Sequence, residues 1–139
     1  MKQQINLDFL GGMAFETELN GHKVYLDADE SVGGKNSAPR PKAFMMVALA
    51  GCTGMDVVSI LRKMRVDFDD LSIGVEAELA DEHPKKYTSM KVVYTFTGKN
   101  LPKDKIQKAV DLSRERYCGV SENYKASFPV THEIVLNDN

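Results

Sequence analysis

The sequence lacks the features that would point to nucleic-acid binding, membrane insertion or secretion. Its 18 basic and 20 acidic residues give a formal net charge of -2, so we expect no basic face for a phosphate backbone. No stretch approaches the roughly 20 uninterrupted apolar residues of a membrane span. The N-terminal residues Met1 to Asp8 contain no apolar signal core. These absences predict a soluble, cytoplasmic protein.

Cysteine is scarce as well. The two cysteines, Cys52 and Cys118, are 66 positions apart (118 minus 52), which excludes a CxxC redox motif and a zinc knuckle. In the cytoplasm, glutathione and thioredoxin keep ordinary thiols reduced, so a permanent disulfide is not expected. The thiols are therefore either two buried structural side chains or a reactive pair.

Other catalytic motifs are also missing. His22, His83 and His132 fall in a turn, a loop and a strand without the spacing of metal ligands. The sequence contains no GxSxG nucleophile elbow and no glycine-rich phosphate-binding loop. The histidines thus give no reason to expect a metal site, and we expect no cofactor.

What is present predicts one α+β domain over residues 1–139, with 42% apolar and 27% charged residues. Asn20-Gly21 between Met13–Leu19 and His22–Leu26 predicts a hairpin with a type I′ turn. A long polar loop is expected over residues 27–41. Alternation at period two predicts further strands over residues 71–79 and 87–97.

Residues 42–65 contain no proline and are rich in helix formers, which predicts a helix of about 24 residues. Its first half is apolar all round and should be buried on every side, which suggests that two copies share a core in a homodimer. After Pro102 the pattern predicts a second helix through Tyr117 and a break at Gly119. A short helix over residues 121–127 and a strand over 129–136 complete the chain.

Gly51 and Gly54 bracket Cys52 inside this otherwise strong helix. Each glycine costs roughly 1 kcal/mol relative to alanine and lets another backbone or a ligand approach closely. The glycines fit a tight helix crossing around a core cysteine, and they equally fit a thiol at the floor of a narrow channel.

Cys118 stands at the junction of two predicted helices. The positive end of a following helix would favour its thiolate, and the negative end of a preceding helix would disfavour it. A cysteine peroxidase needs an attacking thiolate, a cation to hold it and a second thiol to trap the sulfenic acid. The candidate cations are Arg40, Lys42, Arg114 and Arg116.

Three stretches carry a resemblance to a known family: Arg40-Pro41, the run from Ala50 to Leu61 (AGCTGMDVVSIL), and Val110 to Ser113 leading into Tyr117-Cys118. The sequence resembles the OsmC/Ohr superfamily, most closely its branch of small OsmC-like proteins. The resemblance extends over nearly the whole chain.

This resemblance implies an OsmC-like fold, with antiparallel sheets wrapped around a long central helix in an intertwined homodimer. It implies that Cys52 attacks an organic hydroperoxide and that Cys118 resolves the product. It also implies reduction by lipoylated proteins or small dithiols, without haem, flavin or metal.

The sequence departs from the peroxidase members at the arginine and glutamate that poise the attacking thiolate. Met13 stands in place of the arginine, and Lys42 or Ala43 in place of the glutamate. We expect Arg40 to supply the cation and Lys42 to add to it. The alternative is a redox-sensing or hydrophobic-ligand-binding protein with little peroxidase activity, in which residues 44–47 line a pocket. The distance between the two sulfurs separates these functions, because only a close pair can form a disulfide.

Overall fold

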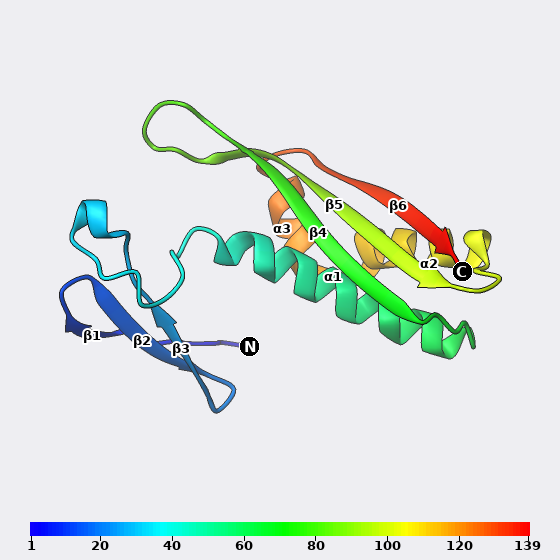
Figure 1. Cartoon of the computed structure of the whole chain (residues 1–139), viewed down its shortest axis with the longest axis horizontal. Helices are drawn as coiled ribbons and strands as arrows, with labels where there is room; N and C mark the ends of the chain where they lie inside the picture. The colour runs from blue at the N-terminus through cyan, green and yellow to red at the C-terminus, as the bar shows by residue number, and fades with distance from the viewer. The chain divides into compact units, whose positions relative to one another are not determined.

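The computed structural model describes all 139 residues, and the chain divides into two compact units, Met1–Met45 and Met46–Asn139. Strands and helices occur in mixed order, which is the α+β class that the sequence predicts (Figure 1). A single domain over residues 1–139 stays a prediction.

The first unit contains an antiparallel sheet of β1 (Asp8–Gly11), β2 (Ala14–Leu19) and β3 (His22–Leu26), in that order. The predicted hairpin is confirmed, because Leu19 pairs with His22 across the turn. Asn20 and Gly21 have φ angles of 53° and 82°, the two positive values that a type I′ turn requires.

The long polar loop after β3 is organised around the carboxylate of Asp27. A short 3-10 helix, η1 (Glu30–Val32), lies within the loop and was not predicted. The Asp27 carboxylate accepts hydrogen bonds from the Ser37 hydroxyl at 2.6 Å and from the backbone N–H groups of Ser37, Ala28 and Lys35. These hydrogen bonds, with Ser37 foremost, hold the pKa of Asp27 well below its usual range.

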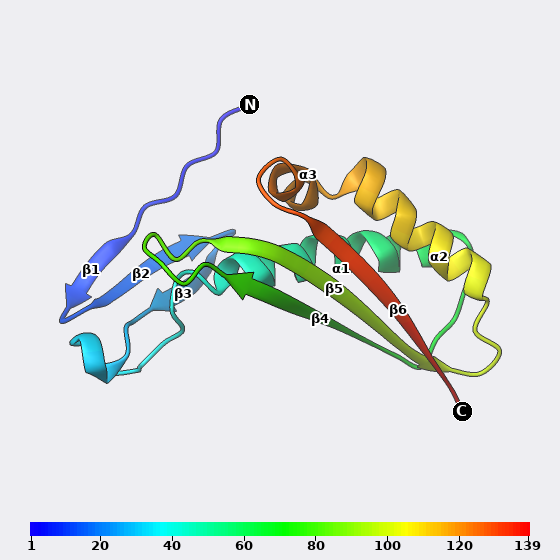
Figure 2. The same ribbon diagram turned by 90° about the horizontal axis from the view of Figure 1, so that it is seen from above.

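The second unit is built on a sheet with the order β4-β5-β6 (Figure 2). Strands β4 (Asp70–Leu79) and β5 (Tyr87–Gly98) confirm the two predicted strands and pair as an antiparallel hairpin. Strand β6 (Val130–Asp138) runs parallel to β5, so the sheet is not wholly antiparallel as expected. The reason is the connection: helices separate β5 from β6, and such a crossover returns the chain in the same direction.

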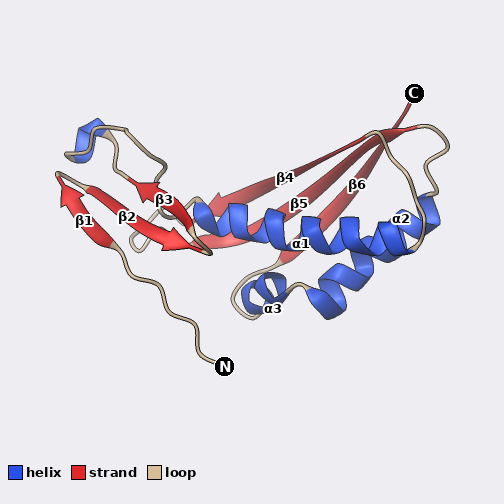
Figure 3. Cartoon of the chain, turned by 90° about the horizontal axis from the view of Figure 1, so that it is seen from below, coloured by secondary structure: helices blue, strands red, loops and turns tan.

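Three helices, α1, α2 and α3, cover one face of this sheet (Figure 3). Helix α1 spans Phe44–Lys63, two residues shorter at each end than predicted. Helix α2 (Lys103–Leu112) continues into the π-helical turn η2 (Ser113–Tyr117), and α3 spans Gly119–Lys125. The helix break falls at Cys118, one residue before the predicted position, because Cys118 has an extended ψ of 100°.

The core of the second unit lies between this sheet and the helices. It is made of apolar side chains from α1, β5 and α2: Leu49, Val57, Leu61, Met90, Val92, Tyr94, Phe96, Ile106, Ala109 and Val110. Gly54 lies on the buried side of α1, and a Cβ there would come within 2.5 Å of Cδ1 of Ile73 on β4. Gly54 therefore permits the close approach of α1 to the strand.

Helix α1 is not buried on every side within one chain. Val47 is 64% exposed and Met55 is 78% exposed, so the expectation of complete burial is not met by a single copy. By length and mean hydropathy (1.9) α1 could also cross a membrane. That is weak support for a membrane span, because core helices of soluble proteins have the same properties.

We predict that Asp27→Asn lowers the stability of the fold at neutral pH, because a neutral amide binds four donors less strongly than a carboxylate does. Because the pKa of Asp27 is lowered by folding, its contribution is complete above about pH 4 and is lost as the pH falls below that value. The difference between the variant and the native protein should thus shrink in acid. Urea unfolding at pH 7 and pH 3 measures it, with the exposed Glu18→Gln as control. Equal unfolding midpoints at pH 7 would contradict the role of Asp27.

Candidate functional site

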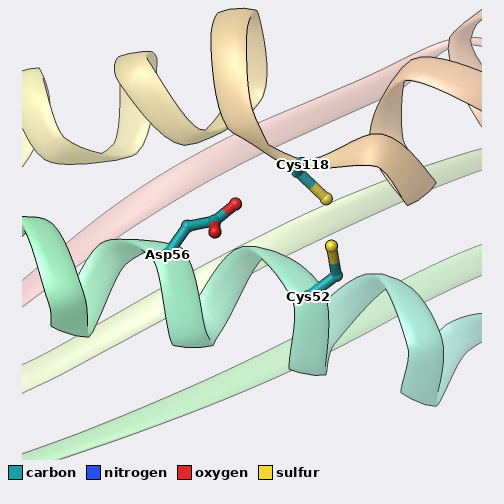
Figure 4. A group of neighbouring side chains, drawn as sticks. All are labelled: Cys52, Asp56 and Cys118. Atoms are coloured by element: carbon teal, nitrogen blue, oxygen red, sulfur yellow. The ribbon is translucent and has the colours of Figure 1, made fainter.

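Cys52 and Cys118 face one another within the second unit (Figure 4). Their sulfur atoms and a carboxylate oxygen of Asp56 all lie within 4.8 Å of one another. Both cysteines are free thiols. Cys52 is half-buried, and Cys118 is buried with 3% of its surface exposed. The structure thus brings together, in one chain, the two cysteines that the sequence singled out.

Helix α1 supplies two of these three groups. Cys52 and Asp56 are four positions apart, so their side chains lie on the same face of the helix, one turn from each other. The glycines around Cys52 differ in their surroundings. Gly54 faces Ile73 of β4, whereas a Cβ on Gly51 would meet no atom within 4 Å.

Cys118 lies between two helical elements, as the C-cap of η2 and the N-cap of α3. Its backbone N–H donates to the carbonyl of Ser113 at 2.8 Å and so ends η2, and it is also the N-cap residue of α3. The backbone N–H of Ser121 donates to its sulfur at 3.3 Å, which favours the thiolate. Burial outweighs this hydrogen bond and raises the pKa of Cys118 to about 11, with Cys52 and Asp56 acting in the same direction. Cys118 is therefore a neutral thiol at pH 7.

A chain of buried hydroxyl groups connects Asp56 to the sheet. Ser113 Oγ donates to Asp56 Oδ2 at 3.2 Å and lies 2.9 Å from Thr53 Oγ1, which lies 2.6 Å from the Tyr94 hydroxyl. Because the Ser113 proton points to the carboxylate, Ser113 accepts from Thr53, and Thr53 in turn accepts from Tyr94. Burial raises the pKa of Tyr94, so this phenol stays protonated and can donate.

Sequence reasoning did not identify Asp56 or the hydroxyl chain as parts of the site. The spacing of Cys52 and Asp56 on a predicted helix could have drawn attention to Asp56. No sequence signal connects Ser113 and Tyr94, because they come from elements far apart in the chain and meet only after folding.

The candidate cations lie in different places. Arg40, in the first unit, donates through Nη1 to Asn36 Oδ1 at 2.7 Å and to the carbonyl of Ala38 at 3.1 Å. Its role toward Cys52 stays a prediction. In the second unit, Arg114 donates through Nη2 to the carbonyl of Val130 at 3.3 Å, and Arg116 is exposed.

A groove of about 910 Å³ runs between α1 and β4 within the second unit. Its lining is mostly apolar, and its charged members come from the last turn of α1 and the start of β4. It is lined by Ala50, Gly51, Gly54, Met55, Val58, Ser59, Arg62, Lys63, Phe68, Asp69, Asp70, Leu71 and Ile73. The groove therefore borders the face of α1 on which Met55 is exposed.

The residues able to bind a metal ion are not the histidines. His22 lies on β3, His83 in the loop between β4 and β5, and His132 on β6. The group with suitable ligand atoms at short separation is Cys52, Asp56 and Cys118. The sequence analysis assessed metal binding from the histidines alone and did not consider this group.

Comparison with known proteins identifies relatives over nearly the whole chain. The family model described as "OsmC-like protein" matches residues 34–133. The chain is 32% identical over 130 residues to Protein YhfA of Escherichia coli, covering 93% of this chain and 94% of that protein.

Solved structures share the fold. A hypothetical protein from Aquifex aeolicus superimposes with a TM-score of 0.86 at 22% identity, covering 100% of this chain and 98% of that one. A structure from Legionella pneumophila, described as an organic hydroperoxide resistance protein OsmC, gives a TM-score of 0.67 at 16% identity, covering 97% of each chain. With the match of the family model and the likeness to YhfA, these findings show that the chain belongs to the OsmC-like family.

Proposed function

We propose that the protein is a thiol-dependent hydroperoxide reductase in which Cys52 attacks the peroxide and Cys118 resolves the product. The observation that carries this proposal is the approach of the two sulfurs to within 4.8 Å in one chain. The S–S bond of a disulfide is about 2.05 Å long, so the two sulfurs must approach each other by less than about 3 Å to form one. Side-chain rotation and small backbone shifts can supply a movement of this size.

The reaction has two oxidative steps. The Cys52 thiolate attacks the outer oxygen of ROOH, the O–O bond breaks, and with one proton the products are a sulfenic acid and ROH. The Cys118 sulfur then attacks the sulfenic sulfur, and water leaves as the disulfide forms. An external dithiol returns two electrons and two protons to restore both thiols. We propose a small dithiol or a lipoylated protein for this role.

The difference in environment between the cysteines supports the assignment of roles. Cys52 is half-buried and can meet a substrate, whereas Cys118 is almost inaccessible. Cys118, with its pKa raised to about 11 by burial, is a poor first nucleophile because only the thiolate attacks peroxides. A buried thiol next to the attacking sulfur suits the resolving step, since a sulfenic acid is formed beside it.

We further propose that Asp56 accepts the proton of Cys118 during resolution. Its carboxylate lies within 4.8 Å of both sulfurs, a distance that one bridging water spans. The hydrogen bond from Ser113 fixes the direction of the carboxylate. Burial, with a smaller contribution from Asp56, raises the pKa of Cys118 and keeps its thiol neutral before the sulfenic acid forms.

Family membership supports this function at a general level. The Legionella pneumophila structure is described as an organic hydroperoxide resistance protein, and we extend that activity to this chain as a proposal. Arg40 remains our proposed cation for the Cys52 thiolate, in place of the arginine and glutamate that the sequence lacks. We propose a cytoplasmic location, where reducing systems keep the thiols of the resting protein free.

The alternative of a redox sensor or hydrophobic-ligand-binding protein is less well supported. Sulfurs unable to approach one another would have favoured it, and they lie within 4.8 Å. The apolar groove beside α1 is the one observation in its favour, and a second copy of the chain explains that groove equally well.

We propose a homodimer in which the groove side of α1 faces a second copy. Met55 is 78% exposed there, and Gly51 leaves open space beside the helix. Exposed apolar side chains on a central helix favour association that removes them from water. A dimer would also give α1 the all-round burial that its composition predicts.

The cysteine assignment predicts different outcomes for two matched variants. Cys52→Ser should reduce turnover of an organic hydroperoxide with a dithiol reductant to the uncatalysed rate. Cys118→Ser should still consume about one equivalent of peroxide per subunit and should accumulate a sulfenic acid on Cys52. Peroxide consumption measures the first effect, and a dimedone adduct located by mass spectrometry measures the second. Hydrogen peroxide, a bulky organic peroxide and a lipid peroxide should be compared as substrates.

The opposite pattern would overturn the assignment of roles. Native turnover in Cys52→Ser would refute Cys52 as the attacking residue. A dimedone adduct on Cys118 in the Cys52→Ser variant, at the native rate of peroxide consumption, would reverse the two roles.

For Asp56 we predict that Asp56→Asn slows disulfide formation by about 10²–10⁴-fold, the usual contribution of a positioned general base. Oxidation of Cys52 should continue, because that step does not need the Cys118 proton to be removed. Stopped-flow kinetics with acid quench and mass analysis separate the two steps. Asp111→Asn, a half-buried aspartate elsewhere in the second unit, is the control. Equal resolution rates in Asp56→Asn and the native protein would exclude the role.

The proposed dimer predicts that Gly51→Leu weakens association. The new side chain has space within one chain, where no atom lies within 4 Å of the added Cβ, but it would overlap a second copy. Overpacking costs about 1–3 kcal/mol, and about 1.4 kcal/mol is a tenfold loss of affinity. Sedimentation equilibrium over a range of concentrations measures the effect, with the exposed Lys103→Leu as control. A native protein that sediments as a monomer would contradict the dimer.

A further inference from the structure

Two thiols and a carboxylate that converge on one point can bind a metal ion as well as react with a peroxide. We propose that the reduced protein binds Zn²⁺ through Cys52, Asp56 and Cys118, with water as the fourth ligand. The proposal needs only the two reduced thiols and does not depend on peroxide reduction.

The separations of the three groups are close to those of a tetrahedral zinc site. With Zn–S distances of about 2.3 Å and Zn–O distances of about 2.0–2.2 Å, two sulfur ligands lie about 3.8 Å apart and a sulfur and an oxygen about 3.5 Å apart. In the structure all three ligand atoms lie within 4.8 Å of one another. Each pair therefore needs to approach by no more than about 1.3 Å, which rotation about side-chain bonds can supply.

The three groups come from two rigid supports and approach from different sides. Cys52 and Asp56 project from adjacent turns of α1, and Cys118 projects toward them from the junction of η2 and α3 (Figure 4). Ligands on opposite sides of a shared point can surround an ion, whereas neighbours on a flat surface cannot. Cysteine sulfur and carboxylate oxygen both belong to the set of protein ligands that bind zinc.

Groups around the site hold two of the ligands in place. Ser113 donates a hydrogen bond to the Asp56 carboxylate, and the backbone N–H of Ser121 donates to the Cys118 sulfur. Outer hydrogen bonds of this kind orient metal ligands, and their loss typically costs about 10–100-fold in affinity. The Ser121 N–H also offsets part of the negative charge of a zinc-bound thiolate.

Binding exchanges protons for the metal and leaves the oxidation state of sulfur unchanged. Each coordinated thiol becomes a thiolate and releases its proton to solvent. The disulfide form has no thiolates to offer, so zinc binding and the disulfide exclude one another. Oxidation by ROOH with uptake of two protons would give the disulfide, ROH, water and free Zn²⁺. Zinc would therefore protect the dithiol, and strong oxidation would release the ion.

Cobalt is a suitable probe of this site because thiolate ligands give Co²⁺ an intense charge-transfer absorption. Titration of the reduced, full-length protein with Co²⁺ should produce this band with one ion per chain, and Zn²⁺ should displace the cobalt and abolish it. Protein oxidised with diamide, and checked for the disulfide by mass, should show no band. A reduced protein without the band, or with a band that either cysteine variant keeps at full intensity, would overturn the proposal.

Four variants test the three ligands and the hydrogen bond from Ser113 to Asp56. Cys52→Ser and Cys118→Ser should each reduce the band and weaken Zn²⁺ binding, measured by competition with a chromogenic chelator. Asp56→Asn should weaken Zn²⁺ binding at least tenfold, and Ser113→Ala by about 10–100-fold. The control Asp111→Asn should bind as the native protein does. Native affinity in both Asp56→Asn and Ser113→Ala would exclude the carboxylate as a ligand. If the native protein shows the cobalt band but no peroxidase activity, the proposed function is contradicted and the proposed metal site is not.

Discussion

The hydrogen bonds of the Thr53 hydroxyl are the constraint on which the site depends. Thr53 is 1% exposed and follows Cys52 directly, and its hydroxyl joins Tyr94 of β5 to Ser113 at the end of α2. In a buried environment such hydroxyl groups must be satisfied, so the three elements are held in one arrangement. That arrangement places Cys52 of α1 opposite Cys118, five residues beyond Ser113, and the same chain of hydroxyls ends on Asp56.

The difference between the two thiols follows from their positions in this packing. Cys118 closes the gap between η2 and α3 and is buried, which raises its pKa. Cys52 lies on a helix whose groove side is still open in one chain, and it keeps partial access. A pair of nearby thiols with unequal access is what the two steps of a thiol peroxidase require. The proposed zinc site uses the same pair of thiols together with Asp56. Reduced thiols can bind zinc, and the oxidised pair forms the disulfide.

Local chemistry made much of the fold predictable. Asn20-Gly21 specified the first hairpin, and the alternation in β4 and β5 specified the second. The ends of α1 and the helix break at Cys118 lie one or two residues from their predicted positions, because helix ends depend on contacts that periodicity does not describe. The parallel pairing of β6 follows from the path of the chain over the sheet, which no local pattern encodes.

The site was predictable in part. Cys52 and Cys118 could be singled out by the scarcity of cysteine, by the neighbouring glycines and by the family resemblance. The folded chain alone brings these two residues together across 66 positions and pairs Asp56 with Ser113.

The most direct test of the proposed mechanism is peptide mapping by mass spectrometry, without reductant, after one equivalent of an organic hydroperoxide is added to the reduced protein. The proposed mechanism predicts a Cys52–Cys118 disulfide within a single chain. Two free thiols, or a disulfide that joins two chains, would contradict it.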